Sequence, residues 1–230
     1  MAAKKRIRKH DLKEDRFVTA TFQLTSFVRE HQNTFLTVLA AVIVLVIVIF
    51  VYTSSRSRTQ ETVMRLAGEA NIAYQRANFQ EAMQHYQALI DLHGGTQEAS
   101  MAAFFLGDIY LKLHDYQKAI KSFQSYIDKY RRDELLTSSA LIGIAACHEQ
   151  LGQYAQAGEF YMKSAEDFPE FFAAPEALMN AGRSYFSAGE VDKAIEAYQM
   201  LIDNYPESRY HDEAKMASAE ITCANDKTVQ

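Results

Sequence analysis

The stretch that decides the fold spans residues 106–127 and reads LGDIYLKLHDYQKAIKSFQSYI. Three of its residues matter most: a small residue at Gly107, an alanine at Ala119 and an aromatic residue at Phe123. Small side chains let two helices approach closely, and residues four apart lie on the same face of a helix. The stretch therefore predicts two helices that pack against each other as a hairpin.

The same pattern occurs four times between residues 60 and 222. The central alanines recur at intervals of 37, 38 and 37 residues: Ala82, Ala119, Ala157 and Ala194. The preceding small residues are Ala70, Gly107, Ala145 and Gly182, and the following aromatic residues are Tyr86, Phe123, Tyr161 and Tyr198. Repetition at such a period is typical of stacked helical hairpins that bury their apolar faces against one another. We therefore expect an all-α fold of about four hairpins.

Glycine and proline predict where the helices of each hairpin end. Gly152 and Gly189 are expected in the tight turn inside a hairpin, because glycine adopts left-handed backbone angles at little cost. Pro169 and Pro206 are expected just after the second helix, which a proline cannot continue. The segment 203–219 should supply a C-terminal cap helix that covers the last apolar face.

An apolar stretch precedes the repeats. Residues 35–52 read FLTVLAAVIVLVIVIFVY and carry no charge. As a helix this stretch is about 27 Å long, close to the hydrocarbon thickness of a bilayer. A cleaved signal peptide is the alternative, but its apolar core is shorter and ends in a small-x-small site, which is missing here. We therefore predict an uncleaved transmembrane helix at 34–53 that contacts the lipid bilayer through 35–52 and continues as helix into 63–74.

Charge predicts the orientation of this anchor. Residues 1–52 carry 8 basic residues (Lys and Arg) and 4 acidic residues (Asp and Glu). The rest of the chain carries 16 basic and 25 acidic residues. The positive-inside rule then places the N-terminus in the cytoplasm and the repeats outside it. In a Gram-negative cell this means a single-pass protein of the inner membrane with a periplasmic repeat domain. The acidic balance of that domain argues against nucleic-acid binding.

These features divide the chain into four segments. We expect a basic cytoplasmic tail at 1–33, the anchor at 34–53, the repeat domain at 54–224 and a disordered tail at 225–230. Apolar residues three and four apart predict a short amphipathic helix at 15–31. This helix could lie on lipid or dock on a membrane-protein partner, and the sequence leaves both open.

No group of residues suggests catalysis. Cys147 and His148 are neighbours, but adjacent residues on a helix diverge by about 100°, so we expect His148 to have a packing role. Two cysteines, Cys147 and Cys223, are too few for a disulfide scaffold, and we expect two buried thiols. Nucleotide-binding, hydrolase and zinc-protease motifs are missing from the sequence. We therefore expect a protein that is not an enzyme and needs no cofactor or metal.

The repeats resemble the tetratricopeptide repeat (TPR) over about 160 of the 230 residues, with a period about three residues longer than the 34 of that family. Their longer hairpins are similar to those of YbgF- and BamD-type envelope proteins. The order of tail, anchor and repeats resembles the YfgM-like ancillary subunits of the Sec translocon. The resemblance implies a right-handed superhelix and a protein–protein interaction module, as an adaptor or chaperone-like subunit. The alternative is a structural scaffold for assembling an envelope machine.

The resemblance also implies a binding surface. In TPR proteins the first helix of each hairpin lines a concave face that binds proteins or peptides. The matching positions here are Asn71, Tyr74, Phe104, Asp108, Leu111, Ile142, Ala146, Glu149, Met179, Arg183 and Phe186. Such a mixture of aromatic, aliphatic and charged residues suits an extended or helical peptide with apolar anchors. The alternative is that several of these residues simply pack inside the superhelix.

Overall fold

The computed structural model describes residues 32–130 and 133–228, and the amphipathic helix predicted at 15–31 lies outside them. All regular structure in the described residues is helical, which confirms the all-α prediction. The chain separates into two compact units, Met1–Gln60 and Glu61–Gln230.

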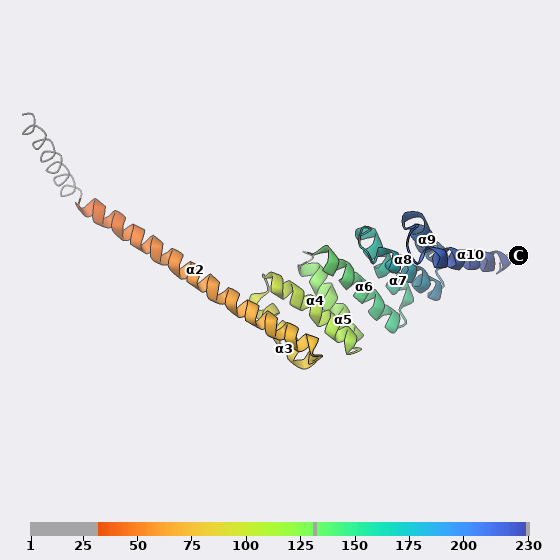
Figure 1. The fold of residues 1–230 in the computed structure, drawn as a ribbon, viewed down its shortest axis with the longest axis horizontal. Coiled ribbons are helices and arrows are strands. Elements are labelled where there is room, and N and C mark those ends of the chain that lie inside the picture. The colour runs from red at the N-terminus through yellow and green to blue at the C-terminus, as the bar shows by residue number, and fades with distance from the viewer. Residues whose placement is uncertain (1–31, 131–132, 229–230) are drawn as a thin grey trace, which may run out of the picture. The chain divides into compact units, whose positions relative to one another are not determined.

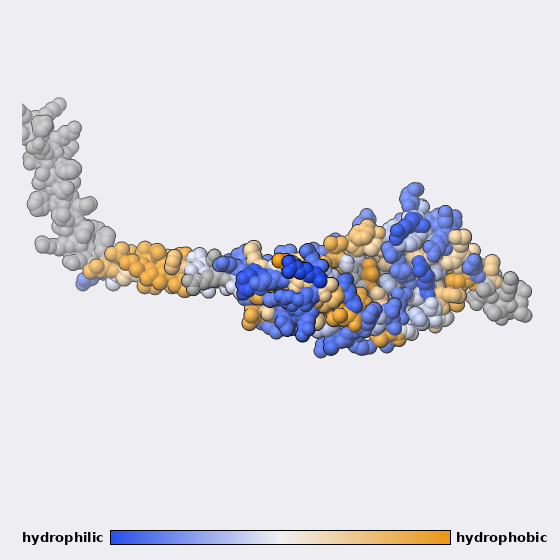
Figure 2. Space-filling model, turned by 60° about the horizontal axis from the view of Figure 1, so that its bottom comes forward, coloured by the Kyte–Doolittle hydropathy of each residue, from blue (hydrophilic) through white to orange (hydrophobic). Residues whose placement is uncertain are grey.

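The first unit contains the apolar part of α2 (Gln32–Gln75). Between Leu36 and Tyr52 each large apolar side chain is at least half exposed. Figure 2 shows the resulting hydrophobic surface. Among the described residues this is the one helix that is long and apolar enough to cross a membrane, judged by length and composition. The helix is unbroken as far as Gln75, as the sequence predicts.

The second unit contains four hairpins and a final helix (Figure 1). We number them repeats 1 to 4 and call the two helices of each repeat A and B. The helices after α2 are α3 (Phe79–His93), α4 (Gln97–Lys112), α5 (Tyr116–Lys129), α6 (Glu134–Gln150), α7 (Tyr154–Asp167), α8 (Ala174–Ser187), α9 (Val191–Asn204) and α10 (His211–Thr228). The A helices are the end of α2, α4, α6 and α8, and the B helices are α3, α5, α7 and α9. From α3 onward each helix contacts the next one along the chain. The last helix packs on α9, as expected of a cap, and includes 225–228 of the predicted tail.

The core of each hairpin is built from the residues that define the repeat. The four central alanines are fully buried. Phe123 lies between Gly107 of its own repeat and Gly143 of the next repeat. A Cβ atom added at Gly107 or Gly143 would come within 2.6 or 2.7 Å of that ring. Glycine at these positions therefore makes room for an aromatic ring between two A helices.

The turn inside each hairpin uses a left-handed residue. The φ angles are +70° at Gly152 and +80° at Gly189, which confirms the predicted role of these glycines. In repeats 1 and 2 the same position is occupied by Ala77 and His114, with φ angles of 55° and 58°. A side chain in this region costs about 1–2 kcal/mol, so these two turns carry strain that the glycine turns avoid.

Two of the four B helices end where proline predicts. α7 ends at Asp167 and α9 at Asn204, each two residues before a proline. Polar side chains cap the N-termini of α4, α5 and α6. Thr96, Asp115 and Asp133 each accept a hydrogen bond from a backbone N–H of the first turn, which has no partner within the helix. Local side chains therefore explain the ends of five of these helices.

Candidate functional site

The predicted binding residues lie on the A helices, in one row that crosses the repeats. α2 supplies Asn71 and Tyr74, and α4, α6 and α8 supply the others. α4 and α6 contact each other directly, although α5 separates them in the chain. α4 and α6 therefore adjoin, and side-chain hydrogen bonds join α2 to α4 and α6 to α8. The facing residues of the A helices can thus form one surface, which we call the inner row. The members of the inner row are Asn71, Tyr74, Phe104, Asp108, Leu111, Ile142, Ala146, Glu149, Met179, Arg183 and Phe186.

At the start of the inner row, polar groups connect repeats 1 and 2. The hydroxyl of Tyr74 donates a hydrogen bond to the carboxylate of Asp108. Lys112 donates to the same carboxylate at 2.9 Å. Burial raises the pKa of the Tyr74 hydroxyl, and the hydrogen bond to Asp108 raises it further. Tyr74 therefore stays protonated at neutral pH and keeps its role as the donor of this link.

Asn71 is also engaged inside the protein. Its Oδ1 accepts a hydrogen bond of 2.7 Å from the hydroxyl of Tyr86, the buried aromatic of repeat 1. The Tyr86 ring stacks on Phe105, with 5.6 Å between centroids and 12° between planes. Asn71 thus joins the A and B helices of one repeat, and its amide nitrogen is the part left to meet a ligand.

Glu149 forms the second link, between repeats 3 and 4. Its carboxylate accepts hydrogen bonds from the Tyr161 hydroxyl at 3.0 Å and the Ser184 hydroxyl at 2.8 Å. Burial, with the charge of Glu149 next, raises the pKa of Tyr161. A carboxylate with two donors is well satisfied. Glu149 therefore acts first as a connection between neighbouring repeats.

The apolar members of the inner row differ in accessibility. Met179 is 1% exposed and belongs to the core of repeats 3 and 4, so it cannot contact a ligand in this conformation. Phe104 is half-buried and packs near Phe105 and Phe123, both at 5.6 Å between ring centroids. Phe186, by contrast, is 53% exposed. The row therefore presents a free aromatic ring near its C-terminal end.

The remaining residues complete this picture. Arg183, one turn before Phe186, is exposed, and its guanidinium lies 3.8 Å from Glu213 of α10. Leu111, Ile142 and Ala146 are partly buried. Because an ion pair at this exposure is worth at most about 1 kcal/mol, Arg183 can exchange Glu213 for a ligand carboxylate at little cost. The accessible part of the inner row thus combines an aromatic anchor with an available cation.

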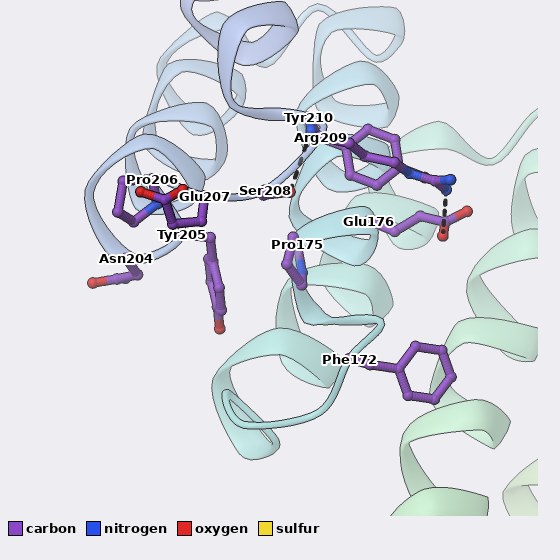
Figure 3. A pocket seen from close by; sticks show the side chains of 10 residues that line it. All are labelled: Phe172, Pro175, Glu176, Asn204, Tyr205, Pro206, Glu207, Ser208, Arg209 and Tyr210. Atoms are coloured by element: carbon purple, nitrogen blue, oxygen red, sulfur yellow. Dashed lines mark hydrogen bonds and ion pairs between the residues drawn. The ribbon is translucent and has the colours of Figure 1, made fainter.

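Apart from the inner row, a hollow lies between two turns that connect repeats (Figure 3). It has a volume of about 680 Å³ and is lined by Phe172, the first turn of α8 and the turn between α9 and α10. Its polar groups bond to the protein itself: the Tyr205 hydroxyl donates to the Pro169 carbonyl at 2.7 Å, and Arg209 lies 3.6 Å from Glu176. These contacts connect consecutive turns, so the hollow is first a place where repeat 4 is fastened to its neighbours. Sequence reasoning did not identify it.

The residues with potential for chemistry have structural roles. Cys147 is fully buried, and burial raises the pKa of its thiol to about 11. His148 stacks on Phe160 at 5.5 Å and 12°, so the predicted packing role is confirmed. Cys223 is exposed, and the prediction of a second buried thiol is wrong because this residue lies on the outer side of α10. Within the described residues, no group of His, Cys, Asp and Glu could hold a metal ion.

Comparison with known proteins agrees with this fold. Residues 25–217 match the tetratricopeptide repeat-like domain family, and the chain belongs to that family. No curated protein matches the chain.

Three solved structures share the fold. A tetratricopeptide repeat protein from Parabacteroides merdae has a TM-score of 0.59 at 16% identity, over 72% of this chain and 62% of that one. RapI in its apo form has a TM-score of 0.58 at 14% identity, over 72% and 49%. MamA from Desulfovibrio magneticus has a TM-score of 0.52 at 18% identity, over 72% and 96%. The chain thus spans less than two thirds of the first two proteins, and the likeness concerns the fold alone.

Proposed function

We propose that this protein is a membrane-anchored interaction module of the bacterial envelope. The repeat domain, 54–224, binds a protein or peptide partner through the inner row. The observation that carries the proposal is that α8, an A helix of a TPR-like stack, exposes Phe186 and Arg183 about one turn apart. Apolar anchors with a few charged neighbours are typical of peptide-binding grooves. A TPR fold is itself typically a scaffold for protein interactions rather than an enzyme.

The proposed anchor is the apolar part of α2. Residues 34–53 cross the inner membrane, with the basic tail, 1–33, in the cytoplasm and the repeat domain on the periplasmic side. Anchoring raises the local concentration of a weak peptide site near its client without any new contact. The role is then that of an adaptor or chaperone-like subunit, and chains that emerge from the Sec translocon are the proposed clients.

Topology is tested by adding protease to intact spheroplasts. We expect the repeat domain to be digested and a short N-terminal fragment to be protected. A chain that stays intact until the membrane is opened would refute the assigned sidedness. A mature protein that begins after residue 53 would show instead that the apolar stretch is a cleaved signal.

Partner binding is tested by affinity purification in mild detergent. The Phe186→Asp variant should recover less partner than the wild-type protein, because a carboxylate replaces the exposed anchor. Leu113→Asp is the matched control, since Leu113 is 47% exposed but lies in a hairpin turn outside the inner row. Equal recovery with both variants would exclude the inner row as the binding surface.

The second proposal is a structural scaffold for an envelope machine, similar to YbgF- and BamD-type proteins. The polar links between repeats favour it, because a stack joined through Asp108 and Glu149 holds its shape while other proteins assemble on it. A scaffold predicts one partner in fixed stoichiometry, whereas an adaptor predicts many transient clients. The same purification, followed by quantitation of the recovered proteins, distinguishes the two.

A further inference from the structure

A groove that the inner row does not use lies between the B helices α3 and α5. Its volume is about 500 Å³, and α4 forms its floor. Ile90 of α3 and Tyr110 of α4 supply most of the apolar surface, and the nearly buried Leu106, 6% exposed, lies at the bottom. An adjoining hollow of about 490 Å³ shares Leu106 and Tyr110, so the depression continues along α3. Together they form an open groove over repeats 1 and 2, which we call the α3–α5 groove.

One wall of the α3–α5 groove is basic. Lys118, Lys121 and Lys129 all line it from α5. Residues 3 and 11 positions apart lie on nearly the same side of a helix, which explains why these three face one groove. At 1.5 Å per residue the lysines extend over about 16 Å. The wall is therefore a row of cations beside an apolar floor.

Two of these lysines have no partner among the described residues. Lys118 is paired with Asp115 at 2.6 Å and lies 5.4 Å above the centre of the Tyr110 ring. No ion pair or hydrogen bond connects Lys121 or Lys129 to any other residue that the structure describes. As far as the described part of the chain goes, the groove thus presents two unpaired ammonium groups toward solvent.

The carboxylates nearby offset only part of this charge. Asp91, on the opposite wall, accepts a hydrogen bond from Gln87 at 2.9 Å, and Asp128 accepts one from Gln124 at 2.8 Å. Since Lys118 is paired with Asp115, the lining of the groove keeps two further lysines against one aspartate, Asp91. This excess of cations stands out in a part of the chain, residues 53–230, with 16 basic and 25 acidic residues. A local cation cluster on an acidic domain selects anionic partners by steering and by contact.

We propose that the α3–α5 groove binds an acidic segment of a partner protein that also carries apolar side chains. The carboxylates would meet Lys121 and Lys129, and the apolar side chains would cover Ile90, Leu106 and Tyr110. An extended segment of about five residues matches the length of the basic row at about 3.3 Å per residue. A lipid headgroup surface would neutralise the lysines but leave the recessed apolar floor empty, so the groove fits a peptide better.

The proposal goes beyond the inner row and does not depend on it. None of the inner-row residues lines the α3–α5 groove. The protein would therefore hold two partners at once, one on the inner row and one in the α3–α5 groove. Variants in one surface should leave binding to the other unchanged.

The test uses the full chain in nanodiscs of uncharged lipid and a fluorescein-labelled peptide of alternating glutamate and leucine, six residues long. Binding is measured by fluorescence anisotropy at two salt concentrations, with empty nanodiscs as the blank. We expect saturable binding that weakens as salt rises, because exposed charge pairs are screened. A peptide of alternating lysine and leucine, and one of alternating glutamate and serine, should bind more weakly.

Charge reversal identifies the surface. The double variant Lys121→Glu, Lys129→Glu should weaken binding of the Glu-Leu peptide about three- to thirty-fold, as expected for the loss of two exposed ion pairs. Lys215→Glu is the matched control, because Lys215 is also exposed and lies on α10. It should change the affinity less than about two-fold, as a remote surface charge does.

Three results would overturn the proposal. The wild-type chain could fail to bind the Glu-Leu peptide, or the control could weaken binding as much as the double variant does. The double variant could also reduce association with phosphatidylglycerol vesicles while leaving peptide binding unchanged, which would make the groove a lipid-contact surface. Circular dichroism of each variant confirms that a loss of binding is not a loss of fold.

Discussion

Replacing Gly182 with alanine should destabilise the repeat domain by about 1–2 kcal/mol. A Cβ atom at this position would lie 2.4 Å from Cε1 of Tyr198, a ring that is 2% exposed and has no room to retreat. Because the approach is far inside contact distance, the overpacking cost should lie in the upper part of the usual range, about 2–3 kcal/mol, and the better helix propensity of alanine offsets about 1 kcal/mol of it. For a domain of this size the melting temperature should fall by about 2–8 °C.

The control for this substitution is Gly68→Ala. Gly68 also lies in a helix, but a Cβ atom added there would meet no other atom within 4 Å, so only helix propensity changes. This variant should gain about 0.5–1 kcal/mol. Both are measured by urea unfolding of the full chain in detergent, followed by circular dichroism in the far ultraviolet. If Gly182→Ala is as stable as Gly68→Ala, close packing of Tyr198 on the A helix is not what holds repeat 4 together.

Three further predictions concern the turns and the thiols. Ala77→Gly should raise the free energy of unfolding and Gly152→Ala should lower it, each by about 1 kcal/mol, because both turns need a left-handed residue. If urea unfolding shows both variants changing stability in the same direction, this explanation is wrong. A maleimide reagent at neutral pH should label Cys223 quickly and Cys147 only after unfolding, as mass spectrometry of the intact chain would show; two fast labels would contradict the burial of Cys147. Burial raises the pKa of the Cys147 thiol from 9.0 to about 11. The buried neutral thiol therefore contributes its full share to the free energy of unfolding below pH 9, and this contribution is lost as the pH rises to 11. The Cys147→Ala variant should therefore lose less stability over that interval, and an identical loss in both proteins would refute the assignment.

The hairpins could be predicted because their core is encoded locally and repeated. Ala82, Ala119, Ala157 and Ala194 are all fully buried, as their period implies. The turn residues were only half predictable. Gly152 and Gly189 signal a left-handed turn, whereas Ala77 and His114 adopt one because the hairpin geometry imposes it. Because alanine and histidine have no marked preference for such turns, the sequence gives no sign that Ala77 and His114 adopt a left-handed conformation.

The candidate site was less predictable than the fold. The positions of the inner row follow from the family pattern, but the partners of their side chains depend on how repeats stack. Tyr74 meets Asp108 and Glu149 meets Ser184 across 34 and 35 residues, and no local rule pairs such residues. The burial of Met179 has the same origin, since it depends on the packing of repeats 3 and 4.

The α3–α5 groove was also missed by sequence reasoning. Its lysines look like an ordinary solvated helix face when α5 is read alone. A signal was nevertheless present, because Lys118, Lys121 and Lys129 share one side of α5 in an acidic part of the chain. What the sequence could not show is that this side borders a recessed apolar floor.

The most direct test of the central claim is site-specific photocrosslinking in living cells. A photoreactive amino acid replaces Phe186 in the inner row or, as a control, Glu196, which is exposed on the B helix α9. We predict crosslinked adducts with other proteins from position 186 and few or none from position 196. Equal adducts from both positions, or none from position 186, would contradict recognition through the inner row.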